Sequence, residues 1–183
     1  MDNTNSNETT FELANFWQRA GAYLIDMIIV GGISYLINGL NISSFKSFLF
    51  YLVFAILGIA YKPFLESYYG ATIGKMALKL KVVDINYNQI DITTSILRSL
   101  ILVFPAVLYI PLFYMAFNNP EFQNLNEVLV FSQAMAREYS MQGIIGNLGF
   151  ILLTADLIFL LTDLNGKNRS LHDRIANTQV IKE

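Results

Sequence analysis

Two acidic residues lie inside apolar stretches of the sequence, and they are the side chains there that could do chemistry. Asp26 interrupts the apolar and small residues 20–35, and Asp156 interrupts a later apolar stretch. A carboxylate near the centre of a membrane helix costs about 2.5–3.5 kcal/mol, so each acid needs a compensating partner. For Asp26 two interpretations stay open: a proton- or cation-binding carboxylate on a transport pathway, or a packing acid neutralised by a proton or by a hydrogen bond from another helix.

Whether Asp26 and Asp156 face each other is a second open question. Two carboxylates in contact repel each other, which raises the pKa of at least one and favours a shared proton, as a proton-coupled carrier would require. If the two acids face different neighbours, each has its own local partner instead. We treat both residues as a candidate ion or proton site.

Arg19 precedes Asp26 by seven residues, which places both on one face of a helix about 10 Å apart along its axis. We expect Arg19 to position the helix end, by reaching the lipid headgroups or by pairing with an acid. Asp173 is predicted at the same membrane boundary, so an ion pair between Arg19 and Asp173 is a specific expectation. Reversing both charges should then restore the assembly that either single reversal abolishes.

A glycine-rich segment follows the second apolar stretch and reads Gly70-Ala-Thr72-Ile-Gly74-Lys75. A nucleotide-binding P-loop needs four residues between its glycines and a Ser or Thr after the lysine, whereas this segment has three and then Met76. We therefore predict a turn that leads into a basic segment lying against anionic headgroups.

The remaining composition excludes several kinds of active site. The chain has no cysteine, and its only histidine, His172, lacks the separated nucleophile and acid of a hydrolytic triad and the neighbouring ligands of a metal site. The net charge of −2 comes with no basic cluster that would suit nucleic acid. We expect no enzyme activity, no cofactor, no metal and no nucleic-acid partner.

The elements that position these residues are four long apolar stretches. The chain is 54% hydrophobic and 14% charged, with a mean hydropathy of +0.45, and residues 48–61 contain no charge at all. Stretches of about 20 residues are long enough to cross the ~30 Å core of a bilayer. We predict an all-α membrane protein, a four-transmembrane-helix bundle in one domain over residues 16–183 after a flexible N-terminus, 1–15. The predicted spans are residues 17–37, 48–65, 96–117 and 144–164.

Shorter elements are predicted in the connections. Residues 76–84 and 90–94 alternate in hydrophobicity on either side of a turn at 86–89, which predicts a small cytoplasmic β-hairpin. Residues 178–181 form a third β-prone stretch that could pair with it. The connection 118–142 carries apolar residues at a spacing typical of a short surface helix.

The distribution of Lys and Arg predicts the orientation. With the N-terminus in the cytoplasm, only Lys46 and Arg137 lie on the opposite side. We therefore expect both termini in the cytoplasm and the protein in the inner (plasma) membrane. The predicted cytoplasmic set is Arg19, Lys62, Lys75, Lys79, Lys81, Arg98, Lys167, Arg169, Arg174 and Lys182.

Three ordered motifs resemble the RDD family of integral membrane proteins. Phe-Trp-Gln-Arg19-Ala through Asp26 resembles its opening, residues 70–84 resemble its glycine-threonine-glycine-lysine stretch and following strand, and residues 170–178 resemble its closing motif. The resemblance places the family's arginine on Arg19 and its two aspartates on Asp26 and Asp173. Asn177 stands where the family usually has glycine, a mild departure because both tolerate left-handed backbone. These domains are suspected of transporting unidentified ligands.

Two functions remain in competition. The first is a small ion or solute carrier, coupled to cations or protons, in which Asp26 binds the ion and Asp156 modulates it; since four helices enclose little space, its pathway favours a homo-oligomer. The second is a non-catalytic membrane scaffold or accessory subunit that binds a protein partner. Neutralising Asp26 should abolish flux but not assembly in a carrier, and should abolish assembly in a scaffold.

Overall fold

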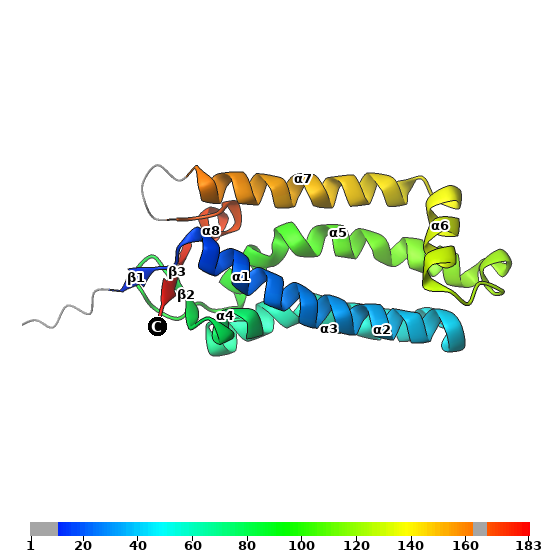
Figure 1. Ribbon diagram of the computed structural model, residues 1–183, viewed down its shortest axis with the longest axis horizontal. Helices are drawn as coiled ribbons and strands as arrows, with labels where there is room; N and C mark the ends of the chain where they lie inside the picture. Colours follow the sequence, from blue (N-terminus) through cyan, green and yellow to red (C-terminus); the bar gives the residue numbers. More distant parts are fainter. Residues whose placement is uncertain (1–10, 163–167) are drawn as a thin grey trace, which may run out of the picture.

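The computed structural model describes residues 11–162 and 168–183, and four long apolar helices dominate it (Figure 1). Each predicted span coincides with one of these helices, and all four helices are long and apolar enough to cross a membrane. The first reaches Phe45 instead of residue 37, and the third begins at Ile92 instead of residue 96. Residues 1–10, Lys167 and the last two residues of the predicted fourth span, 163 and 164, lie outside the described residues. The spans are Phe16–Phe45, Phe48–Tyr69, Ile92–Asn118 and Met141–Leu161.

The first span contains two π-helical turns. It runs through α1 (Phe16–Asp26), η1 (Met27–Gly31), α2 (Gly32–Leu40) and η2 (Asn41–Phe45). Asn15 begins α1 with a capping box. Because a π turn inserts an extra residue into the helix, η1 changes the face that the helix presents directly after Asp26.

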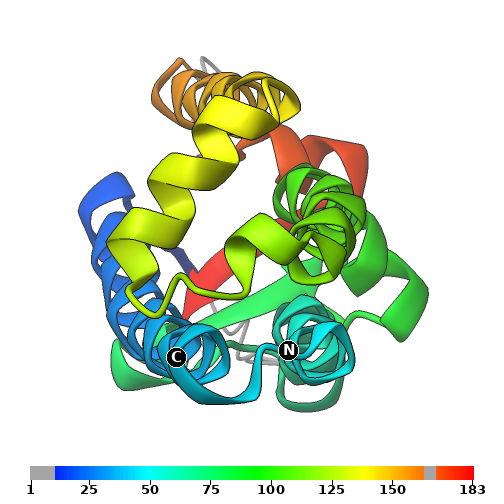
Figure 2. The same cartoon turned by 90° about the vertical axis from the view of Figure 1, so that its right-hand side faces the viewer.

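The other three long helices pack side by side. α3 (Phe48–Tyr69) packs against α5 (Ile92–Asn118), and α5 packs against α7 (Met141–Leu161). The first span contacts α3 through α2 and contacts the short helix α4 (Ile73–Ala77) through α1. Seen along the bundle, the four spans surround a common centre (Figure 2). Each therefore presents one side to its neighbours and leaves an apolar side for lipid.

A three-stranded sheet lies at one end of the bundle (Figure 1). Its strands are β1 (Glu12–Leu13), β2 (Leu80–Asp84) and β3 (Thr178–Lys182), antiparallel in the order β1-β3-β2. The predicted pairing of the C-terminal segment with the central connection is thus confirmed. We call this end of the bundle the sheet end.

The predicted hairpin is confirmed only in its first half. Gln89 forms a single bridge to Val83, and the helix α5 begins at Ile92, so the predicted returning strand at 90–94 is wrong. Asp91 caps this helix by accepting a hydrogen bond from Thr94 N at 2.8 Å. The capping interaction outweighs the alternation of residues 90–94 because it satisfies a helix donor that would otherwise be unpaired.

The opposite end is closed by α6 (Val128–Glu138), the predicted short helix, which follows the 3₁₀ turn η3 (Pro120–Phe122). Its side chains Phe131 and Met135 are buried. The helix crosses the end of the bundle (Figure 2), so it buries its apolar face against protein. We call this the α6 end.

Each end has its own apolar core. At the α6 end, aromatic rings dominate: Tyr51 stacks on Phe113 with centroids 4.1 Å apart, and Phe117 lies 5.5 Å from Phe131. At the sheet end, the core consists of smaller aliphatic residues from α1, β2, β3 and their flanks. It comprises Ala14, Ala22, Leu80, Val82, Ile90 and Val180. The candidate site lies next to this second core.

Candidate functional site

A buried ion-pair network joins the helices at the sheet end, with Arg98 of α5 at its centre. The Arg98 Nε donates to Glu66 Oε2 of α3 at 2.9 Å, and its Nη1 donates to Asp173 Oδ1. All three side chains have 0% exposure. Because two carboxylates flank one guanidinium, removing any member leaves buried charges with one ion-pair partner fewer.

Asp173 is shared between two arginines. It lies in α8 (Leu171–Ile175), where Oδ2 accepts from Arg19 Nη2 and from Ser170 N at 3.1 Å, the latter as part of a capping box. Burial alone would raise the pKa of Asp173, but Arg19 and Arg98 outweigh it and hold that pKa well below its usual range. The expected ion pair between Arg19 and Asp173 is present, and Arg98 is its unexpected third member.

Lys75 extends the network to α4. Its Nζ donates to Glu66 Oε1, and its side chain is only 13% exposed. Burial lowers the pKa of Lys75, and the neighbouring Glu66 opposes that shift. The expectation that Lys75 lies against lipid headgroups is therefore wrong, because Glu66 attracts the ammonium group into the protein.

Asp26 is surrounded by neutral donors. Its carboxylate accepts from Tyr61 Oη at 2.8 Å, from Thr72 Oγ1 at 2.6 Å and from Gly74 N at 2.8 Å. Hydrogen bonds of this kind stabilise a carboxylate without a cation. Asp26 thus links α1 to α3 and to the beginning of α4. A hydrogen bond from another helix is what the packing interpretation of Asp26 requires, and Tyr61 of α3 donates one.

The glycine-rich segment is a joint between these helices. Gly70 ends α3 with φ of 75°, a backbone that favours glycine. A Cβ on Gly74 would lie 2.1 Å from the main-chain oxygen of Ala22, so only glycine lets α4 approach α1 this closely. The segment therefore connects α3 to α4, and its side chains and backbone contact other parts of the protein. Its residues are Gly70, Thr72, Gly74 and Lys75.

Asp156 has a different partner. It accepts from His172 N at 2.9 Å, and its Oδ1 lies 2.8 Å from His172 Nδ1. The two side chains are 19% and 15% exposed, in contrast to the fully buried Arg98. Burial lowers the pKa of His172 to about 4, against the opposing effect of Asp173, so the ring is neutral at pH 7. In the described contacts, Asp26 and Asp156 have separate hydrogen-bond partners.

Sequence reasoning missed Glu66 and the central role of Arg98. Glu66 directly follows the end of the predicted second span, and the sequence marks Arg98 only as one of the predicted cytoplasmic cations. The available signal was a pair of opposite charges near the same boundary of two consecutive spans. Antiparallel neighbours would bring such charges to the same height, which is where α3 and α5 place them.

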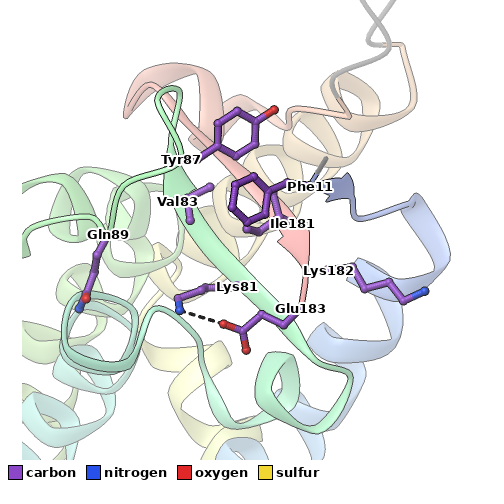
Figure 3. A pocket seen from close by; sticks show the side chains of 8 residues that line it. All are labelled: Phe11, Lys81, Val83, Tyr87, Gln89, Ile181, Lys182 and Glu183. Carbon is purple, nitrogen blue, oxygen red and sulfur yellow. Dashed lines mark hydrogen bonds and ion pairs between the residues drawn. The ribbon is translucent and has the colours of Figure 1, made fainter. Parts of the chain in front are cut away.

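A separate groove of about 210 Å³ lies at the sheet (Figure 3). The rings of Phe11 and Tyr87 stack there with centroids 4.9 Å apart, and Lys81 Nζ lies 2.8 Å from Glu183 Oε1. None of the residues of the ion-pair network lines it. Across residues 11–162 and 168–183, no group of three His, Asp, Glu or Cys side chains is placed to hold a metal ion.

Comparisons with known proteins identify one family. The family model described as "RDD family" matches residues 13–177, which is nearly the whole chain. The match includes Arg19, Asp26 and Asp173, the residues through which α1 contacts α8 and α4. Neither the curated proteins nor the solved structures contain a match. This chain is a multi-pass membrane protein that belongs to the RDD family.

Proposed function

We propose that the protein is a small membrane carrier for an ion or solute, coupled to protons or cations, and that Asp156 and His172 form its titratable site. The observation that carries the proposal is the partly exposed contact between the carboxylate and the imidazole at the end of a membrane span. Among the described residues, Glu66 and Asp173 are fully buried against arginine, and Asp26 is saturated by neutral donors. Asp156 and His172 are therefore better able to exchange a proton than Asp26.

The low pKa of His172 suits such a role. An exposed imidazole has a pKa of about 6.5, whereas burial holds that of His172 at about 4. A rearrangement that exposes His172 to water would return its pKa toward 6.5 and let the ring take up a proton near neutral pH. Proton binding and the movement of α8 against α7 would then be coupled.

The proposal includes the orientation and assembly of the carrier. We place the sheet end in the cytoplasm of a cell whose inner membrane holds the protein, in line with the excess of Lys and Arg at that end. Most of the α7 surface is unburied, which leaves room for a second copy to complete a pathway. Crosslinking in native membranes should then give discrete dimers or larger species.

The test is proton flux in proteoliposomes that contain a pH-sensitive dye, with Na⁺, K⁺ and Li⁺ added in turn. We expect a cation-dependent pH change that Asp156→Asn and His172→Gln abolish while both variants remain folded. Asp91→Asn is the matched control, because asparagine also caps helices and Asp91 lies outside the site. Flux that survives Asp156→Asn but not Asp26→Asn would transfer the site to Asp26.

The second candidate is a non-catalytic scaffold or accessory subunit that binds a protein partner, and the coordination of Asp26 favours it. Three donors from α3 and α4 occupy this carboxylate, as expected for an acid that fixes helix packing. A scaffold predicts that Asp26→Asn loses its single species in detergent gel filtration, together with any bound partner. Absence of flux from well-folded wild type would reject cation/proton exchange and favour the scaffold.

A further inference from the structure

The fourth span carries an asparagine, Asn147, whose side chain has no partner within the chain. Asn147 is exposed, and within residues 11–162 and 168–183 no group donates to its amide or accepts from it. The other polar side chains of the spans are satisfied close by, as Thr154 is by donating to Phe150 O at 2.7 Å. Each of the other asparagines in the spans donates its amide nitrogen to a main-chain oxygen. These asparagines are Asn38, Asn41 and Asn118.

Asn147 lies near the middle of the membrane. A Cβ built on Gly149 would be 3.6 Å from Pro105 Cβ, so Gly149 is level with Pro105 on the neighbouring helix. Pro105 is the central residue of the third span, Ile92–Asn118. Asn147 is two residues from Gly149, which is about 3 Å of helix. Its amide is therefore at a depth where no water or headgroup is available as a partner.

The side chain of Asn147 is also on the outer side of α7. The helix packs against α5, with α6 and α8 at its two ends. The side toward α5 is marked by Ile145, which is buried, and by Gly149. Asn147 is two residues from each of them, which places it about 160° away around the helix. It shares this outer side with Ile151, which is 60% exposed, and with Gly143, where a Cβ would meet nothing within 4 Å.

Lipid chains cannot satisfy a primary amide, because they offer no donor and no acceptor. A bond to the main chain of α7 would use the amide nitrogen alone and leave the oxygen without a donor. The amide group is, however, complementary to another copy of itself, since its N–H groups carry partial positive charge and its oxygen partial negative charge. In membranes, asparagine side chains form such hydrogen bonds between helices.

We propose that α7 is an interface with a second copy of this chain, in which the two Asn147 amides donate to each other across a twofold axis along the membrane normal. Both copies insert in the same orientation, so the two amides lie at the same depth and each supplies the partner that the other lacks. Gly143, one turn earlier, lets the two backbones approach closely. This inference rests on the assembly stated in the proposed function and names its contact, but it does not require transport.

The first test is oxidative crosslinking of single cysteine variants in native membranes. The chain has no cysteine of its own, so each introduced thiol is unique. Ile151→Cys places a thiol one turn from Asn147 on the same side of α7, and we expect it to form a disulfide-linked dimer. Val107→Cys is the matched control, because Val107 is exposed near the middle of α5. Equal dimer yields from the two variants, or a crosslink of Ile151→Cys only to a different protein, would overturn the interface.

The second test separates the amide from the surrounding apolar surface. Asn147→Leu removes both hydrogen-bonding groups and should raise the dissociation constant of the dimer about tenfold, measured by energy transfer between labelled copies at decreasing protein-to-lipid ratio. Asn147→Gln retains the amide and should stay close to the wild type. Both variants should keep the helix content of the wild type, because Asn147 bonds to nothing within one copy. An unchanged dissociation constant in folded Asn147→Leu would overturn the proposal.

Proton flux measured on the same vesicles distinguishes this inference from the carrier proposal. A dimer that depends on Asn147 but shows no flux would reject the carrier and leave the interface in place. Flux from vesicles in which Ile151→Cys does not crosslink would support the carrier and overturn the α7 interface.

Discussion

The two ends of the bundle are held together by different interactions. At the α6 end, stacked aromatic rings such as Tyr51 and Phe113 fill the space between helices. At the sheet end, Arg98 and its two carboxylates lie between the helices, with a small aliphatic core beside them. The same helix, α5, takes part in both arrangements.

The difference has an energetic meaning. Apolar and aromatic packing is non-directional, so it tolerates substitutions of similar volume at modest cost. Buried ion pairs require each partner in place, because a single unpaired charge is costly in a low-dielectric environment. A single substitution in the ion-pair network of the sheet end should therefore lower the free energy of unfolding more than a substitution of similar volume at the α6 end.

Removing the central charge should have the largest effect. Arg98→Ala leaves Glu66 and Asp173 without their shared partner, and we expect a loss of about 4 kcal/mol in the free energy of unfolding. Thermal unfolding in detergent, followed by circular dichroism, measures this loss. A change below about 1 kcal/mol would mean that the network does not determine stability at the sheet end.

Exchanging the charges of Arg19 and Asp173 should not fully restore stability. The expectation from sequence was rescue, but Asp173 also pairs with Arg98, so an arginine at position 173 would face a second arginine. We expect R19D/D173R to recover only part of the melting temperature that D173R loses, because the arginine at position 173 would still face Arg98. Recovery to the wild-type melting temperature would show that Arg98 can leave this contact.

At the α6 end, Phe131→Ala removes the aromatic side chain between Phe113, Phe117 and Phe122. The expected cost is about 3 kcal/mol, from lost burial and the cavity left behind. Phe131→Leu should retain most of the stability, since packing tolerates such an exchange. Limited proteolysis should show cleavage near α6 with the sheet end still protected; opening of both ends together would contradict their separation.

Gly74→Ala tests the close approach of α4 and α1. The added Cβ would lie 2.1 Å from Ala22 O, so the backbones must separate, at a cost of about 2–3 kcal/mol. Gly58→Ala is the matched control, because its Cβ meets nothing within 4 Å, and alanine is the better helix former. Equal melting temperatures for the two variants would contradict the close contact.

Lowering the pH should destabilise the sheet end through His172. The folded protein holds the ring neutral to a pKa of about 4, whereas the unfolded ring titrates near 6.5, so the unfolded state binds the extra proton between these values. Stability is therefore full above pH 6.5 and decreases toward pH 4, with about 2 kcal/mol lost at pH 5. His172→Gln should flatten the melting temperature in this range. A wild-type profile equally flat would contradict the buried neutral imidazole.

Sequence periodicity and composition predicted much of this architecture. The four spans, the helix at 128–138, the β2 and β3 pairing and the contact of Arg19 with Asp173 all follow from local patterns and from the side of the membrane on which each residue falls. Even Asn177 adopts the left-handed backbone, with φ of 51°, that its place in the closing motif implied. The returning strand at 90–94 failed because its alternation is short and Asp91 caps a helix instead.

What the sequence determined by itself was which segments enter the membrane, since length and hydrophobicity suffice for that. Only the tertiary structure decided which charges meet. Asp26 and Asp156 look alike in sequence, yet one meets hydroxyl and amide donors and the other meets His172. The physical reason is that pairing depends on how adjacent helices are rotated and placed, and Glu66 and Arg98 meet because α3 and α5 pack side by side.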